Sequence, residues 1–413
     1  MATIKPFKAV RPVPEKAADV AALPYDVYNR EEAAAAVYGK YDSFLRVDRP
    51  ESTLDHRMNM YDPFVYEQAA KNLQRLYDRH VIVQDEKPCL YIYELVMDGR
   101  SQTGLVACTA VDEYLDNTIK KHELTREDKE QDRIKHVDAC NANTGPIFLT
   151  YRDQPSIDEI IDTVKQQEPV ADFVAEDGIT HRVWVIDQDD QIERLVENFK
   201  DVPNFYIADG HHRSASAVKV GLMRREQHPD YQGDEEFNYF LSVLFPDNQL
   251  AIMDYNRVVK DLNGLSKDAF LEALRDKFTI ENKGKDAVRP PEKASFGMYL
   301  DGEWYLLKAK EGIYDPEDPV ASLDVAILQD QVLIPILGIQ DIRTDKRIDF
   351  VGGIRGLEEL ERRVKSDMTV AFSMHPTSIA ELMAIADADL LMPPKSTWFE
   401  PKLRSGLFIH NLD

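Results

Sequence analysis

Two predicted β-hairpins constrain the fold of this chain more than any other feature of its sequence. Residues 89–111 place two apolar, strand-like runs around Asp98-Gly99, and residues 296–309 do the same around Asp301-Gly302. Asp-Gly pairs favour the two-residue turns that join antiparallel strands. Helical and strand-like segments alternate irregularly with these hairpins. We therefore expect a mixed α/β (α+β) architecture rather than a purely parallel, doubly wound sheet.

Apolar spacing predicts helices between these strands. Val65, Ala69, Leu73 and Leu76 recur at helical spacing, the charged stretch 120–136 is also interpreted as helix, and Ser266 is a predicted N-cap. The polar stretch 226–237 is typical of a loop or boundary. At 413 residues the chain is long enough for two or three domains. We expect two, at residues 1–228 and 229–413.

The charge balance limits the partners. With 50 Lys and Arg against 74 Asp and Glu, the net charge is −24, and such a surface repels nucleic acids and anionic membranes. A local basic pocket for a small anion remains compatible with it. There are 3 cysteines and no CxxC pair, so neither a disulfide framework nor a structural zinc site is expected. No long apolar run or leader-like segment stands out, which predicts a soluble, cytoplasmic protein.

The sharpest local motif is Asp209-Gly210-His211-His212-Arg213, followed by Ser214. It lies where the predicted strand 204–208 ends and a helix begins, and the start of a helix favours phosphate oxygens. Gly210 permits close backbone approach, Arg213 suits a bidentate phosphate contact, and the histidines suit acid–base work. The competing interpretation is that Asp209 caps the helix while the histidines pack or lie in solvent. Adjacent histidines do not match the spacing of a zincin-type metal site.

Three further groups are weaker candidates. The basic cluster within residues 120–136 is interpreted either as a site for anionic groups or as a solvated helix with internal ion pairs. Within this cluster, we expect Arg126 and Arg133 on one helical face and Glu123 one turn before Arg126. Asp26, in a Pro-Tyr-Asp turn, is a possible base or an ordinary turn residue. Near the C-terminus a compact donor group follows two prolines. The basic cluster contains Lys120, Lys121, His122, Glu123, Arg126, Arg133 and His136. The donor group contains Lys395, Ser396 and Thr397.

Several of these motifs together resemble the domain of unknown function 1015 family. They occur in order from about residue 5 to the C-terminus and are LPYDV, KKHE followed by DR, NTGPIFLTY, ADGHHR, NRVV and ADADLLMPPKSTWFEPKLRSGL. The family name itself implies no activity.

The ADGHHR segment is also similar to the signature box of the ParB/sulfiredoxin-like superfamily, which includes nucleotide-dependent free-serine kinases. This resemblance implies a ParB/sulfiredoxin-like nucleotide-binding core followed by a second, mixed-sheet C-terminal α/β domain. It implies that residues 209–213 contact nucleotide phosphates, with ATP or ADP and Mg²⁺ as cofactors. It also implies an acidic base toward the serine hydroxyl. Asp26 is the first candidate for that base by position and Glu123 the second.

The expected function is therefore phosphoryl transfer between a nucleotide and a small hydroxylated metabolite, with serine and O-phosphoserine as the implied pair. His212 would stabilise charge on the moving group, and Lys395 and Ser396 would close the site from the second domain. Three alternatives remain open: a phosphoserine phosphatase-type hydrolase, a non-catalytic nucleotide-binding regulator and a scaffold protein. The sequence is also compatible with a homodimer.

Overall fold

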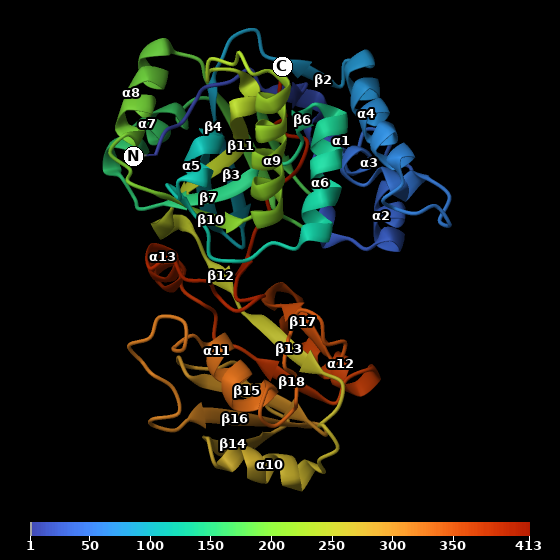
Figure 1. Ribbon diagram of the computed structural model, residues 1–413, viewed down its shortest axis with the longest axis vertical. Helices are drawn as coiled ribbons and strands as arrows, with labels where there is room; N and C mark the ends of the chain where they lie inside the picture. Colours follow the sequence, from blue (N-terminus) through green and yellow to red (C-terminus); the bar gives the residue numbers. More distant parts are fainter. Residues whose placement is uncertain (1) are drawn as a thin grey trace. The chain divides into compact units, whose positions relative to one another are not determined.

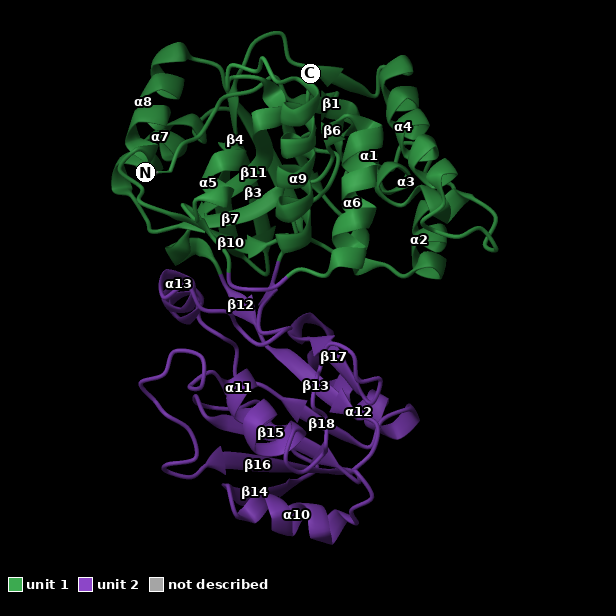
Figure 2. Ribbon diagram, in the orientation of Figure 1, with its two compact units in different colours: residues 1–121, 125–250, 401–413 green, residues 122–124, 251–400 purple. Residues whose placement is uncertain are grey.

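The computed structural model describes residues 2–413 and divides the chain into two compact units. Unit 1 contains residues 1–121, 125–250 and 401–413, and unit 2 contains residues 122–124 and 251–400 (Figure 2). The expected division at residues 228 and 229 falls inside unit 1, in the loop between a helix and a central strand. Unit 1 is discontinuous in sequence, because the last 13 residues belong to it.

Unit 1 is built on an eight-stranded mixed sheet with the order β5-β10-β7-β11-β4-β3-β9-β8 (Figure 1). β10 pairs in parallel with β5, and β11 pairs in parallel with β7, while the other pairings are antiparallel. The mixed α/β class expected from the hairpins is therefore confirmed. The strands of unit 1 are β1 (Val10–Pro12), β2 (Ile82–Gln84), β3 (Leu90–Met97), β4 (Arg100–Ala110), β5 (Ile119–Lys120), β6 (Ala142–Asn143), β7 (Ile147–Tyr151), β8 (Ala171–Val174), β9 (Thr180–Ile186), β10 (Phe205–Asp209), β11 (Tyr239–Pro246) and β20 (His410–Asn411).

Helices cover this sheet, and two of them, α6 and α9, carry residues of the candidate site. α6 packs against both α9 and α4, and α7 packs against α8. The helices of unit 1 are α1 (Ala17–Val20), α2 (Arg30–Val37), α3 (Leu45–Asp48), α4 (Pro63–Asp78), α5 (Val111–Leu115), α6 (Glu127–Cys140), α7 (Pro155–Val164), α8 (Asp189–Phe199) and α9 (His211–Gln227).

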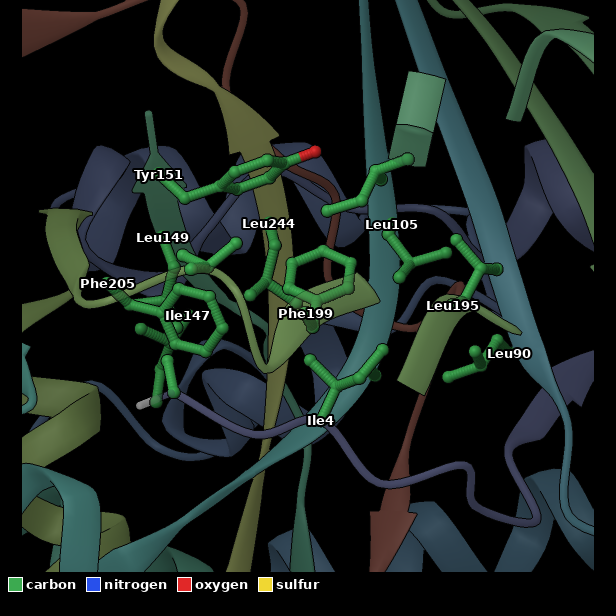
Figure 3. Packing of buried hydrophobic residues seen from close by; sticks show 14 of the residues in the cluster. Ile4, Leu90, Leu105, Ile147, Leu149, Tyr151, Leu195, Phe199, Phe205 and Leu244 are labelled. Carbon is green, nitrogen blue, oxygen red and sulfur yellow. The ribbon is translucent and has the colours of Figure 1, made fainter. Parts of the chain in front are cut away.

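The main core of unit 1 lies between the sheet and helices α7, α8 and α9. Figure 3 shows side chains from several strands meeting Leu195 and Phe199 of α8. Phe199 forms edge contacts with Tyr151 and Phe205, at centroid distances of 5.1 and 5.9 Å. This packing holds β7 and β10 rigidly behind the turn that leads into α9.

Unit 2 contains a six-stranded sheet with the order β14-β16-β15-β18-β13-β17. All its pairings are antiparallel, so the mixed sheet expected for the C-terminal part is an antiparallel one. The strands of unit 2 are β12 (Ile252–Met253), β13 (Tyr255–Val259), β14 (Phe278–Gly284), β15 (Ser295–Leu300), β16 (Glu303–Ala309), β17 (Ile348–Gly352), β18 (Val370–Ser373) and β19 (Trp398–Phe399). The helices are α10 (Lys267–Arg275), α11 (Asp324–Leu328), α12 (Gly356–Ser366) and α13 (Ile379–Asp387).

Most local predictions are confirmed. Both Asp-Gly turns have positive φ at each residue, as the two-residue hairpin turn requires, and Ser266 caps α10 through the Ala269 N–H. The helix predicted over 120–136 is wrong in its first half. α6 begins at Glu127 because Arg126 is extended, with φ −100° and ψ 130°, and residues 122–124 belong to unit 2.

Among residues 2–413, no helix combines the length and the apolar character needed to cross a bilayer.

Candidate functional site

The strand-to-helix turn at residues 209–213 is built as the sequence predicted. β10 ends at Asp209 and α9 begins at His211, with Gly210 as the N-cap residue at φ 96°. Only glycine adopts this conformation at little cost. A Cβ on Gly210 would also lie 3.1 Å from Nε of Arg213, so the missing side chain leaves room for the guanidinium. The first N–H groups of α9 point toward this end of the helix, where they favour an anion.

Asp209 is held by a lysine from the far end of the sequence. Its Oδ2 atom lies 2.9 Å from Nζ of Lys402 in the returning C-terminal segment. Burial disfavours the charged carboxylate, but the positive charges of Lys402 and Arg213 outweigh it and hold the pKa of Asp209 well below its ordinary value. The helix-cap role considered for Asp209 is wrong, since Gly210 occupies the cap position.

The hydrogen bonds of His212 determine its tautomer. Its Nε2 atom accepts the backbone N–H of Arg126 at 3.0 Å. A neutral imidazole that accepts at Nε2 carries its proton on Nδ1. His211 is buried, with 7% of its surface exposed. Ser214 is fully buried and donates its hydroxyl to the carbonyl of Gly210 at 3.0 Å, so this hydroxyl supports the helix rather than facing a ligand.

Arg213 lines a small cavity at the N-terminal end of α9. The cavity has a volume of about 30 Å³, which is room for about two water molecules. Arg213 donates to the carbonyl of Pro146 and passes close to Gly145. A second guanidinium, that of Arg133 from α6, lines the same cavity, and so do the side chains of Tyr25, Asp48, His136, Asn143, Thr144, Ser216 and Ser405.

Arg133 is buried and is fixed by a network of polar groups around it. Its Nε and Nη2 atoms both donate to Oδ2 of Asp132, at 2.9 and 2.7 Å, and its guanidinium lies 4.2 Å from the ring centroid of Tyr25. Burial opposes the charge, but Asp132, Tyr25 and Asp48 raise the pKa of Arg133. Asp48 also accepts the hydroxyl of Thr144 at 2.8 Å. This guanidinium therefore stays charged and in place.

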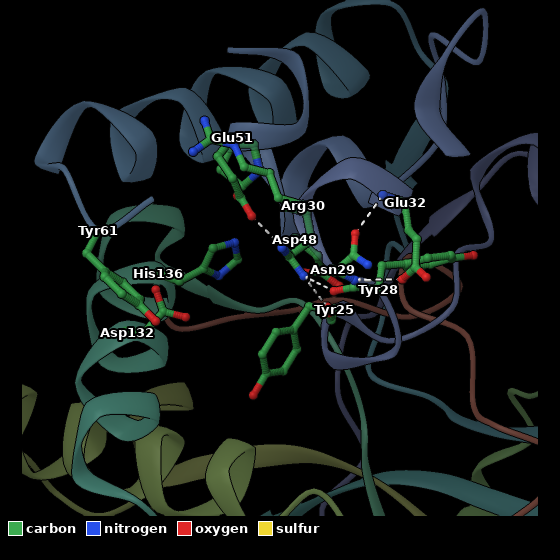
Figure 4. Close-up of polar contacts among 12 residues, drawn as sticks. Tyr25, Tyr28, Asn29, Arg30, Glu32, Asp48, Glu51, Tyr61, Asp132 and His136 are labelled. Atoms are coloured by element: carbon green, nitrogen blue, oxygen red, sulfur yellow. Dashed lines mark hydrogen bonds and ion pairs between the residues drawn. The ribbon is translucent and has the colours of Figure 1, made fainter. Parts of the chain in front are cut away.

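His136 closes the inner side of the cavity as a neutral donor. Burial and the neighbouring charge of Arg133 lower its pKa. Its Nε2–H donates to the carbonyl of Val47 at 2.8 Å. Figure 4 shows His136 and Asp132 projecting from α6 toward the segment that carries Tyr25 and Asp48.

The remaining predicted residues of unit 1 have different surroundings. Asp26 is exposed on the short 3-10 turn Tyr25–Val27. Burial and the charge of Asp26 raise the pKa of Tyr25, while the charges of Arg133 and Arg213 lower it. Because Tyr25 lines the cavity, its interaction with Asp26 places Asp26 near the cavity. The Lys121 ammonium donates to the carbonyl of Tyr114 at 2.8 Å and lies 4.1 Å from the centroid of the Tyr114 ring. The expectation that Arg126 and Arg133 share one face is wrong, because Arg126 precedes the helix and pairs with Asp128 in solvent.

Five predicted residues belong to unit 2. His122 is 1% exposed, and its carbonyl accepts the N–H of Met392 at 2.8 Å. Ser396 is buried, donates its hydroxyl to the carbonyl of Pro393 at 2.5 Å, and accepts from Thr377 at its own carbonyl. Its side chain therefore shapes the turn instead of presenting a donor. The others are Glu123, Lys395 and Thr397; Lys395 is exposed.

Sequence reasoning assigned no role to four residues that line or hold the site. Asp48 lies outside every motif, Tyr25 lies in the turn that was singled out for Asp26, and Ser405 lies in the C-terminal motif that was singled out for Lys395. The partner of Asp209, Lys402, is separated from it by 193 positions.

The donors around Arg213 fit phosphate oxygens better than they fit a metal ion. Arg133, Arg213 and the start of α9 are all positive or donating groups. The carboxylate of the turn, Asp209, is already neutralised by Lys402 and does not fit the role of a Mg²⁺ ligand.

The sequence profile of the family "Protein of unknown function (DUF1015)" matches residues 4–326. The chain belongs to this family. The DUF1015 match covers the DGHHR turn, Asp48 and Arg133, whereas the C-terminal motif with Lys395 and Lys402 lies beyond it. No protein of curated function has a sequence that matches this DUF1015 chain.

Solved structures that are similar to this DUF1015 protein share little sequence with it. A mutant free serine kinase in complex with AMP has 12% identity, covers 74% of this chain and 91% of its own, and has a TM-score of 0.37. SbnI with C-terminal truncation from Staphylococcus aureus has 14% identity, coverages of 74% and 86%, and a TM-score of 0.39. A conserved hypothetical protein from Pyrococcus furiosus has 14% identity, coverages of 74% and 94%, and a TM-score of 0.34. Likenesses this weak establish neither a shared fold nor a shared function.

Proposed function

We propose that this protein is a phosphotransferase that moves a phosphoryl group between a nucleotide, ATP or ADP, and a small hydroxylated metabolite. Serine and O-phosphoserine are the proposed metabolite pair, in either direction. One observation supports this most directly: Arg213 of the DGHHR turn and Arg133 of α6 line the same cavity at the N-terminal end of α9. In a chain of net charge −24, two guanidiniums converging on one helix end favour an oxyanion.

The proposed roles follow from this placement. Arg213 and the first turn of α9 hold phosphate oxygens, and Arg133 supports them from beneath. Mg²⁺ arrives with the nucleotide and is held mainly by its phosphates. His212, a neutral donor at Nδ1, stabilises charge on the phosphoryl group during transfer.

The transfer itself balances without any further reactant. The metabolite hydroxyl oxygen bonds to phosphorus as the bond from phosphorus to the nucleotide oxygen breaks. The hydroxyl proton passes to a carboxylate. Asp26, exposed beside Tyr25, is the first candidate for this base, and Glu123 is the second. The reverse reaction follows the same path backward.

Phosphorus NMR of exchange between ATP or ADP and a panel of hydroxylated metabolites tests the proposal. We expect His212→Ala and Arg213→Ala to abolish exchange while leaving the fold intact. Arg224→Ala is the matched control, because Arg224 lies on the same helix but pairs with Asp138 at 2.8 Å; its rate should equal that of the wild type. Wild-type rates in both site variants would overturn the proposed site.

The same experiment separates the other functions. Release of phosphate from phosphoserine without ADP would indicate a hydrolase. Nucleotide binding without any single-turnover transfer would indicate a regulator, and no thermal shift with any of these ligands would indicate a scaffold. Asp26→Ala and Glu123→Ala, measured separately, identify the base.

A further inference from the structure

Arg257 of β13 is a buried charged side chain in unit 2. It is 1% exposed, and burial lowers its pKa to about 10. Its Nη1 donates to the carbonyl of Tyr255, and its Nη2 donates to the carbonyl of Lys395 at 3.0 Å. Its Nε atom is buried without a hydrogen-bond partner. Most buried charges in proteins are paired, so this arrangement requires a physical reason.

No acidic side chain among residues 2–413 compensates this charge. The one titratable group whose charge raises the pKa of Arg257 is the phenol of Tyr255. The nearby carboxylate of Asp254 is committed elsewhere, accepting from Asn256 at 2.6 Å and from Arg289 at 3.3 Å. An uncompensated buried cation destabilises a fold. A residue that breaks this rule is expected where function uses it.

The contact with Lys395 connects this charge to a surface turn. Lys395 has a φ of 60°, in the left-handed region that a lysine seldom adopts. The Arg257 guanidinium holds its carbonyl, while Ser396 bonds back to Pro393 and accepts from Thr377. The turn is therefore fixed from below, and the exposed Lys395 side chain starts from a defined backbone position.

Aromatic rings surround the two cations. Arg257 lies 5.4 Å from the ring centroid of Phe350, and the Lys395 ammonium lies 5.8 Å from that of Tyr255. Trp398 packs edge-on against Tyr255 at 5.0 Å. Because Arg257 is itself only 1% exposed, water screens its charge poorly there.

We infer that Arg257 is a positioning residue for a phosphate-type oxyanion site at Lys395. Arg257 fixes the turn and adds an uncompensated positive charge beneath it, and the Lys395 ammonium contacts the anion. The identity of the anion as a phosphate rests on the proposed function. The observation of an uncompensated buried charge beneath Lys395 does not depend on the proposed function.

The test measures binding of inorganic phosphate to the full chain carrying Arg213→Ala, so that the site beside α9 does not contribute. In this background Arg257→Met should weaken phosphate binding by about tenfold or more. It should change the melting temperature without phosphate only slightly, because the loss of two hydrogen bonds to carbonyls opposes the gain from removing an uncompensated buried charge. A purely structural arginine would give the opposite pair of results, with a lower melting temperature and unchanged phosphate affinity.

Two further variants keep the result decisive. Lys395→Asn removes the ammonium while tolerating the left-handed backbone, and it should lose phosphate binding with no change in stability, even if Arg257→Met folds poorly. Arg347→Met is the control, because Arg347 pairs with Asp345 at 2.9 Å; it should lose stability and keep phosphate affinity.

Unchanged affinity in Arg257→Met or in Lys395→Asn would overturn the inference, and so would the absence of phosphate binding in the Arg213→Ala chain. None of these readouts needs turnover. A failure of the proposed phosphotransfer is therefore recognised separately, by exchange measurements.

Discussion

At the residue scale, the partner of Asp209 decides the chemistry of the DGHHR turn. An aspartate before a helix is usually interpreted as a cap, yet here Gly210 takes the cap position and Asp209 pairs with Lys402. The carboxylate is therefore a fixed negative charge that holds the C-terminal segment against the turn. Arg213, one helical turn along, remains directed to Pro146 and the cavity.

Removing the lysine should expose this dependence. In Lys402→Met the Asp209 carboxylate loses its main stabilising charge, and we expect a loss of about 1–3 kcal/mol in unfolding free energy near neutral pH. The wild-type pKa of Asp209 lies below its ordinary value, so its contribution to stability is full above the ordinary value and is lost as the pH falls. In the variant this pKa rises, and the acid limb of the stability curve moves to higher pH.

Urea unfolding across the acid range measures this shift. Lys200→Met, which removes an exposed pair with Glu197, should change stability by less than about 0.5 kcal/mol. An acid limb in Lys402→Met that coincides with that of the wild type would show that Lys402 does not control Asp209.

At the element scale, the turn between β10 and α9 works because one residue has no side chain. Gly210→Ala should cost about 1–2 kcal/mol through its left-handed backbone. It should also weaken nucleotide or phosphate binding, because the new Cβ would meet the Arg213 guanidinium at 3.1 Å. Gly178→Ala is a close control, since Gly178 has a similar φ of 82° and nothing within 4 Å of its Cβ position.

Calorimetric binding and thermal unfolding of both variants distinguish the two effects. We expect equal destabilisation and a binding defect in Gly210→Ala alone. Equal binding in the two variants would mean that Arg213 tolerates displacement.

Helix α7 carries a carboxyl group that should make stability depend on pH. Burial raises the pKa of Asp158 to about 7, with help from a hydrogen bond to Asp153 and the charges of Asp153 and Asp162. A raised pKa means that the protonated group favours the folded state. Its contribution to stability is therefore full at low pH and is lost as the pH rises through about 7.

Asp158→Asn should remove part of this dependence. Comparing unfolding at about pH 5 and about pH 8, we expect the variant to lose less stability than the wild type between the two conditions. Asp190→Asn, at an exposed position of α8, should follow the wild type. A wild-type pH response in Asp158→Asn would assign the effect to other groups.

At the scale of the whole molecule, the last 13 residues complete a unit formed mainly by the first 250. Phe408 lies 5.5 Å from Tyr91 and 5.9 Å from Tyr93, ring centroid to ring centroid. The segment also contributes Lys402 and Ser405 to the site. Its buried apolar side chains are those of Leu403, Leu407, Phe408, Ile409 and Leu412.

A chain truncated after residue 400 should therefore lose the fold of unit 1. Each buried leucine or aromatic side chain contributes roughly 1.5–3 kcal/mol, and five of them approach the total stability of a domain, about 5–15 kcal/mol. Near-ultraviolet circular dichroism and thermal unfolding measure the loss. Deletion of the exposed Asp413 alone should have no effect. A cooperative transition of unit 1 in the truncated chain would contradict this account.

Local chemistry was predictable from the sequence. The Asp-Gly turns, the helix from Pro63 to Asp78, the Ser266 cap and the strand–glycine–helix passage at 204–213 all depend on neighbouring residues, and each is found where it was expected. The extent of α6 was not, because the extended conformation of Arg126 is associated with a contact to His212, 86 positions away.

By itself the sequence determined the mixed fold class, the turn that starts α9 and the arginine that this turn presents. These depend on backbone preferences and apolar periodicity over a few residues. Only the tertiary structure decided that Arg133 and Asp48 join Arg213 around one cavity, that Lys402 neutralises Asp209, and that no acidic side chain of the described residues, 2–413, pairs with Arg257. Charges act through space rather than along the chain, so their partners are defined only after folding brings distant segments together.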